Sequence, residues 1–175
     1  MSAKVKIEIQ IMQDNLCELR KIAGWTAETL AGKLGITKQT ISNLENQKVK
    51  LSRVQYIAIR SVFECEVAMS RDNTTLRKVM GVLFTATPLV YQDRKDEIRT
   101  AMISIASIAS AGITGIQLHS SATALLASLG SVASQMGCSH IGEPSLMWLL
   151  EDLKDPDTSE IGNTESLEDT PDEES

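Results

Sequence analysis

The sequence is poor in aromatic residues and in cysteine. Aromatic residues make up only 3% of its 175 residues, so a core must be built mainly from Ile, Leu, Val, Met and Ala. The three cysteines, Cys17, Cys65 and Cys138, are odd in number, widely spaced and free of any CxxC pair. This usage is typical of reduced thiols and excludes a disulfide framework. The N-terminus also lacks the basic and apolar regions of a secretory signal, so we expect a cytoplasmic protein.

The sequence also lacks the groupings that form an enzyme active site. Its two histidines, His119 and His140, have no acid at a recognisable spacing, and no phosphate-binding glycine loop is present. Cys138 with His140 is too small a group to hold a metal. We therefore expect no enzymatic activity, no cofactor and no metal site.

Charge is distributed unevenly along the chain. The net charge is −6, but residues 1–80 contain 13 Lys and Arg against 8 acids, whereas residues 151–175 contain 1 against 11. The N-terminal part is therefore basic, and the acidic total does not argue against a nucleic-acid partner.

The most informative stretch is residues 26–46, TAETLAGKLGITKQTISNLEN. Gly35 can adopt the positive φ that a tight corner needs, and the Thr37 hydroxyl can cap a second helix. Apolar residues recur at helical spacing on both sides of this corner: Leu30 and Leu34 before it, Ile41 and Leu44 after it. The pattern predicts two short helices around a tight turn.

Four of these positions, Ala31, Gly35, Ile41 and Leu44, resemble the helix-turn-helix signature. Over roughly residues 13–66 the sequence is similar to the lambda-repressor/Cro-type, or Xre, family. The resemblance implies that Arg20 and Glu45 form a scaffold pair that links the first helix to the end of the third. It also implies that the exposed residues at the start of the second helix of the motif enter the major groove of DNA, namely Thr37, Lys38, Gln39, Thr40 and Asn43.

The chemistry of these residues fits that role independently. Gln39 and Asn43 can each contact adenine, Lys38 can reach guanine or phosphate, and the Thr40 methyl can meet a thymine methyl. Three more basic residues, Lys48, Lys50 and Arg53, would form a rim that faces phosphates. We therefore expect a homodimeric transcriptional regulator that binds specific sequences of double-stranded DNA.

Residues 4–11 alternate between apolar and polar side chains. Val5, Ile7, Ile9 and Ile11 occupy every second position, which predicts a half-buried strand that either pairs with a second subunit or lies as an arm on the domain.

Further along, a helix is expected over about 13–23, and Ser52 with Gln55 predicts a capping box for another helix. In that helix Arg60 would face phosphate or water, and Val54, Ile57, Ala58 and Val62 would point inward. Asn73 would cap a following helix with a buried stripe of Leu76, Val79, Met80 and Leu83.

No Lys, Arg, Asp or Glu occurs from Thr100 to Gly142. This stretch divides into two helix-length pieces, 101–118 and 122–136, and three interpretations stay open. The pieces can form a soluble dimerisation hairpin, a membrane-associated hairpin that holds the regulator at the cytoplasmic face, or an antitoxin-like module that binds a different protein. Length favours the soluble hairpin, because a spanning helix needs about 20 predominantly apolar residues.

The C-terminal end is acidic and contains few apolar residues, which predicts disorder and permits competition with DNA for the basic face. In outline we expect an all-α protein with a short N-terminal strand. Its predicted parts are a strand or arm at 1–11, the helix-turn-helix domain at 12–66, a hinge at 67–73, a helical domain with the uncharged hairpin at 74–153, and a disordered acidic tail at 154–175.

Overall fold

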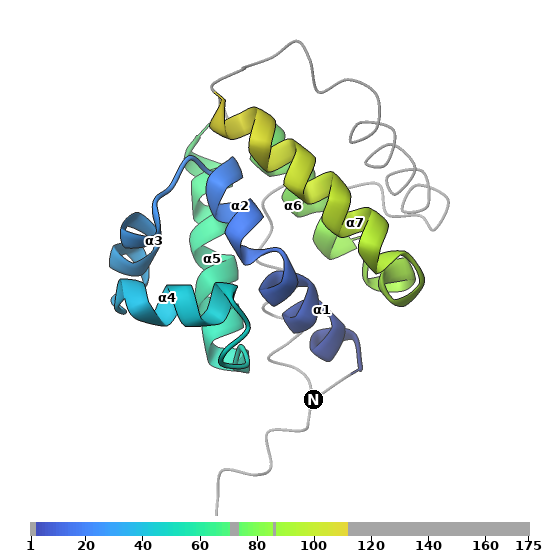
Figure 1. Cartoon of the computed structure of the whole chain (residues 1–175), viewed down its shortest axis with the longest axis horizontal. Helices are drawn as coiled ribbons and strands as arrows, with labels where there is room; N and C mark the ends of the chain where they lie inside the picture. The colour runs from blue at the N-terminus through green and yellow to red at the C-terminus, as the bar shows by residue number, and fades with distance from the viewer. Residues whose placement is uncertain (1–2, 71–73, 86, 112–175) are drawn as a thin grey trace, which may run out of the picture.

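The computed structural model describes residues 3–70, 74–85 and 87–111. Within these ranges the chain forms seven helices and no strand (Figure 1). The helices are α1 (Ala3–Asp14), α2 (Leu16–Ile22), α3 (Ala27–Leu34), α4 (Lys38–Glu45), α5 (Arg53–Met69), α6 (Thr74–Thr85) and α7 (Thr87–Ser110).

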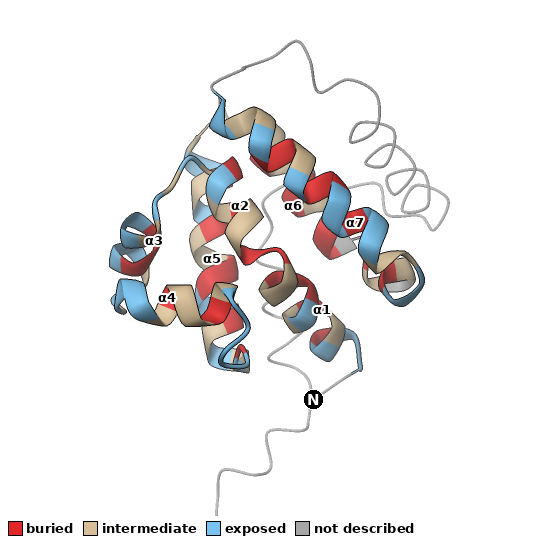
Figure 2. Ribbon diagram, in the orientation of Figure 1, coloured by how far each residue is buried: buried red, intermediate tan, exposed pale blue. Residues whose placement is uncertain are grey.

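One hydrophobic core joins all seven helices. In Figure 1, α3 and α4 lie on one side of the α1–α2 pair, and α6 and α7 lie on the other. Figure 2 shows the buried residues gathered where α1, α2, α5, α6 and α7 face one another. The helices on either side of the predicted hinge therefore share a core. Residues 67–69 belong to α5, while 71–73 lie outside the described residues.

The predicted N-terminal strand is wrong, because residues 3–14 form helix α1. The helix buries Val5, Glu8, Ile11 and Met12, which recur at helical rather than alternating spacing. The helical pattern is not visible in the sequence because Glu8 is one of its buried positions, and a carboxylate is rarely buried unless it is paired. Here Glu8 Oε2 accepts hydrogen bonds from the Tyr56 hydroxyl at 2.7 Å and from Arg60 Nη1 at 3.1 Å.

The same buried pair corrects the expected orientation of α5. Arg60 is 5% exposed and faces Glu8 rather than phosphate or water. Val54 and Ala58, which were expected to point inward, are exposed. The buried side of α5 is instead formed by Tyr56, Ile59, Phe63 and Val67. The predicted capping box is confirmed, since the Ser52 side chain accepts from the Gln55 backbone and the Gln55 side chain accepts from the Ser52 backbone.

Helices α6 and α7 form the second layer. The predicted stripe on α6 is confirmed, because Leu76, Val79, Met80 and Leu83 are all buried. Pro88 is tolerated in the first turn of α7, where a backbone N–H has no helical partner. The described part of the uncharged stretch continues α7, and its Met102, Ile105 and Ala106 are buried in the core where α7 packs on α2.

Several expectations fall outside the described residues. They include Asn73, both histidines, Cys138, the second hairpin piece and the acidic tail. In the described part of the chain, no helix is both long enough and apolar enough to cross a membrane.

Candidate nucleic-acid interface

The corner between α3 and α4 follows from local sequence. The Thr26 side chain caps α3 by accepting from the Thr29 backbone at 3.1 Å, and Gly35 ends α3 with a φ of 67°. The Thr37 side chain then caps α4 by accepting from the Thr40 backbone, also at 3.1 Å. Apolar residues from both helices close the corner from inside, and Leu30, Ile41 and Leu44 are fully buried. The polar side of α4 is thereby turned outward.

A bidentate ion pair fixes the far end of α4. Arg20 Nε lies 2.6 Å from Glu45 Oε1, and Arg20 Nη2 lies 3.1 Å from Glu45 Oε2. A third donor, Arg20 Nη1, reaches the Trp25 carbonyl at 2.9 Å. Hydrogen bonding to Glu45 raises the pKa of the Arg20 guanidinium. Because both side chains are largely buried, the pair holds α4 rigidly against α2.

The outward face of α4 carries the residues expected to read DNA. Thr37, Lys38 and Gln39 are exposed, while Thr40 and Asn43 are half-buried. Gln39 Nε2 donates to Asn43 Oδ1 at 2.9 Å, which places the two amides side by side one turn apart. This face is polar, uncovered by the rest of the described fold, and opposite the buried Ile41 and Leu44.

The loop after α4 is shaped by a residue that sequence reasoning did not single out. Gln13 Nε2 donates to the Val49 carbonyl at 2.6 Å, and Gln13 Oε1 accepts from the Leu51 backbone at 3.0 Å. Gln47 takes a positive φ of 56° in the same loop. The loop contains no glycine or proline, so these side-chain bonds from α1 set its course. Nothing in the local sequence pattern marks Gln13 for this role.

Lys48 and Lys50 project from that loop and are exposed. Arg53, at the start of α5, is half-buried. All eight residues predicted to contact DNA therefore lie in one continuous segment of the chain, from the Thr37 cap through α4 and the loop after it to Arg53, the first residue of α5.

The comparison with protein families bears directly on this arrangement. Residues 18–68 match the family model described as "Helix-turn-helix". The chain carries a helix-turn-helix domain of the lambda-repressor/Xre type. This places DNA binding and transcription regulation on the matched segment. No curated protein and no solved structure matches the chain.

The helix-turn-helix domain is embedded in a larger fold. The match covers most of α2 and all of α3 and α4, and ends one residue short of the last residue of α5. Helices α1, α6 and α7 lie outside it, yet all three pack on the matched segment. Helix α1 packs on α4 and α5, α6 packs on α2 and α5, and α7 packs on α2. The loop that follows α4 is tied to α1, which the match does not include.

A carboxylate lies beside the polar face of α4. The Lys38 ammonium forms an ion pair with Glu28 on α3, and this contact lowers the pKa of the Glu28 carboxyl. Both side chains are more than half exposed, so water screens the pair. Any anionic ligand at Lys38 would therefore have to compete with Glu28.

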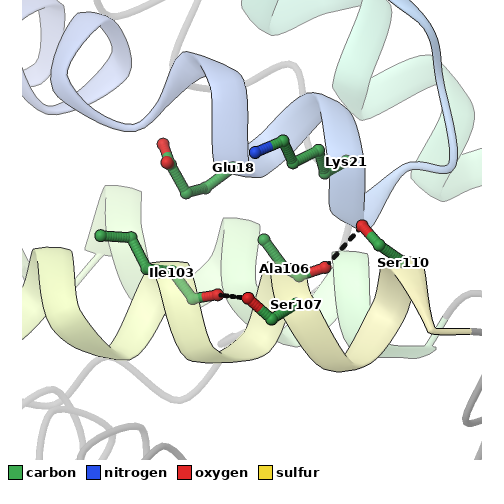
Figure 3. A pocket seen from close by; sticks show the side chains of 6 residues that line it. All are labelled: Glu18, Lys21, Ile103, Ala106, Ser107 and Ser110. Atoms are coloured by element: carbon green, nitrogen blue, oxygen red, sulfur yellow. Dashed lines mark hydrogen bonds between the residues drawn. The ribbon is translucent and has the colours of Figure 1, made fainter.

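A hollow of about 350 Å³ lies where α7 runs past α2 (Figure 3). Glu18 and Lys21 border it from α2, and Ile103 from α7. The Ser107 hydroxyl donates to the Ile103 carbonyl and the Ser110 hydroxyl to the Ala106 carbonyl, each at 2.8 Å. These hydroxyls are thus bonded to their own helix, and the hollow lies away from α4.

Proposed function

We propose that the protein binds specific sequences of double-stranded DNA as a homodimer and thereby regulates transcription. In this proposal α4 enters the major groove with Thr37, Lys38 and Gln39 leading. The observation that carries it is the exposed, rigidly held polar face of α4 within a helix-turn-helix domain. A recognition helix needs both properties, because base edges are read by side chains at fixed positions.

The paired amides on α4 suit an adenine. Because Gln39 Nε2 donates to Asn43 Oδ1, Gln39 Oε1 is left to accept from adenine N6 and Asn43 Nδ2 is left to donate to adenine N7. The two side chains would then act together on one base pair. The Thr40 methyl, one residue along from Gln39, would meet a neighbouring thymine methyl.

The loop residues Lys48 and Lys50, with Arg53 and Lys38, would contact phosphates on the two sides of α4. Such contacts carry little sequence information but fix the register of the helix in the groove. Anchoring of this loop by Gln13 supports the role, since a phosphate contact positions a protein only if the donor is itself held in place.

The homodimer follows from how helix-turn-helix domains read DNA. One α4 covers only a few base pairs, and two copies on one face of the duplex would bind half-sites about one helical turn apart. A dimer raises affinity because the second half-site binds at high effective concentration.

Selection of bound duplexes from a random pool tests this function. The purified full-length protein is used at salt near physiological, where non-specific binding is weak. The proposal predicts recovery of a two-fold symmetric motif with half-sites about 10 base pairs apart. Recovery of no motif by protein that is folded by circular dichroism would contradict it, and an asymmetric single half-site would contradict the dimer.

A further inference from the structure

A basic groove runs between α1 and the start of α5, next to the helix-turn-helix face. Its volume is about 690 Å³, and residues of α1, α5, α7 and the loop after α4 line it. The lining side chains that matter most are Lys6 and Gln10 from α1, Lys50 from the loop, Arg53 from α5, and Lys95 from α7. We propose that this groove binds the sugar-phosphate backbone of DNA beyond the half-site that α4 reads. The inference rests on the proposed function and extends it to helices outside the matched domain.

The first reason for assigning a DNA backbone to this groove is its charge. Four cations line the groove, Lys6, Lys50, Arg53 and Lys95, against a single carboxylate, Asp14. Asp14 pairs with Lys95 and also accepts hydrogen bonds from Gln47 and Tyr91, so the net positive charge of the lining comes from the other three cations. A polyanion that enters the groove therefore meets a net positive surface, and the release of counterions from DNA would favour its binding.

The second reason is that the groove is continuous with the polar face of α4 and the loop after it. Lys50 belongs both to the phosphate-facing loop and to the wall of the groove. Gln13 ties that loop to α1 through two hydrogen bonds shorter than 3.1 Å, so α4, the loop and the groove are parts of one rigid unit. A backbone strand that leaves Lys48 and Lys50 would pass next along Lys6, which is exposed on α1.

The chemistry of the groove favours a backbone over bases. Its lining contains no aromatic side chain on which an unpaired base could stack. It contains instead long basic side chains and the amide of Gln10, which are the usual donors to phosphate oxygens.

The acidic C-terminal segment is the competing occupant. Residues 151–175 carry 11 acids against 1 basic residue and could present the same kind of charge to Lys6 and Arg53. The two occupants make opposite predictions. If DNA fills the groove, removal of a groove lysine weakens DNA binding. If the acidic segment fills it and competes with DNA, the same change strengthens DNA binding.

The test combines one protein change with one DNA change. Full-length Lys6→Gln is compared with Lys21→Gln, which removes the same charge from α2 at the other hollow, where Ser107 and Ser110 of α7 lie. Along α7 that hollow is roughly 18 Å from Lys95, at 1.5 Å per residue. Affinity is measured on the selected site with long flanks and on the same site with both flanks trimmed to the outer edge of the half-sites.

The proposal predicts that Lys6→Gln lowers affinity for the long duplex about fivefold at 0.15 M salt and lowers the salt slope by about one. On the trimmed duplex this difference from wild type should disappear, and Lys21→Gln should match wild type on both. The proposal would be overturned if Lys6→Gln and Lys21→Gln changed the affinity equally. It would also be overturned if the loss of affinity in Lys6→Gln persisted on the trimmed duplex. Tighter binding by Lys6→Gln would assign the groove to the acidic segment. Failure of the wild-type protein to select any motif would instead reject the proposed function itself.

Discussion

Gln47, in the turn after α4, donates from Nε2 to Oδ1 of Asp14 on α1 at 2.8 Å. The other oxygen of Asp14 accepts from the Tyr91 hydroxyl and lies 2.8 Å from Lys95 Nζ, and both of these residues belong to α7. One largely buried carboxylate therefore joins α1, α7 and the loop after α4. Helix α7 supports the helix-turn-helix domain through this contact although it lies outside the matched residues.

Asp14→Ala should destabilise the fold by about 2 to 3 kcal/mol, because it leaves a buried tyrosine hydroxyl and an ammonium without their carboxylate. Burial raises the pKa of Tyr91, so its hydroxyl stays protonated and needs an acceptor at neutral pH. Urea unfolding measures the change. Asp93→Ala, at an exposed position on α7, is the matched control and should stay within about 0.5 kcal/mol of wild type. Equal effects of the two substitutions would contradict the role of Asp14.

Glu8→Ala should cost about 3 kcal/mol, because it removes the closer of the two carboxylates that pair with the buried Arg60 and the acceptor of the buried Tyr56 hydroxyl, and leaves only Glu64 beside Arg60. Gln10→Ala, on the exposed side of the same helix, should change the free energy of unfolding by no more than about 0.5 kcal/mol. The comparison separates helix α1 from a strand, in which Glu8 would face solvent. A negligible effect of Glu8→Ala would argue for the strand.

Glu28→Gln should strengthen DNA binding by about two- to fivefold at 0.15 M salt, since it frees Lys38 to pair with a phosphate. The Lys38 ammonium lowers the pKa of Glu28, so the carboxylate is charged at neutral pH in the wild-type protein. Glu18→Gln removes the same charge from α2, beside the hollow between α2 and α7, and should leave affinity unchanged. Titration with salt should shrink the gain. Unaltered affinity in Glu28→Gln would show that Lys38 does not reach DNA.

Glu64 makes stability depend on pH. Burial raises its pKa above the ordinary value of 4.5, and the attraction of Arg60 offsets this only in part. The folded state therefore holds the Glu64 proton more tightly than the unfolded state, and this contribution to stability is lost as pH rises through the folded pKa. Glu64→Gln carries a neutral side chain at every pH. The free energy of unfolding of this variant minus that of wild type should therefore increase from pH 4 to pH 7. Urea unfolding at both pH values decides, and a constant difference would contradict the burial argument.

The helix-turn-helix corner could be predicted because its determinants are local. Gly35 takes the left-handed φ, Thr37 caps α4, and the spacing of Ile41 and Leu44 alone identifies the inward face. The pair of Arg20 and Glu45 followed only from the resemblance, since 25 residues separate the two partners.

The N-terminal helix could not be predicted, because the contact that explains its burial pattern joins residues far apart in the sequence. Its helical pattern appears only if Glu8 counts as buried, and the partner that permits this burial, Arg60, lies 52 residues away. The loop after α4 depends likewise on Gln13, which acts 36 residues from its own position. Local periodicity carries no information about such long-range polar contacts.

In the proposed complex, α4 reads bases while the loop after it contacts phosphates. The most direct measurement is the affinity of Asn43→Ala and Lys48→Ala for the selected site and its single-base variants across a salt titration. Asn43→Ala should lose about 1 to 3 kcal/mol of preference at one base position and keep the wild-type salt slope. Lys48→Ala should weaken binding to every sequence alike and lower the slope by about one. If both variants lost affinity uniformly across all sequences, α4 would not be in the major groove.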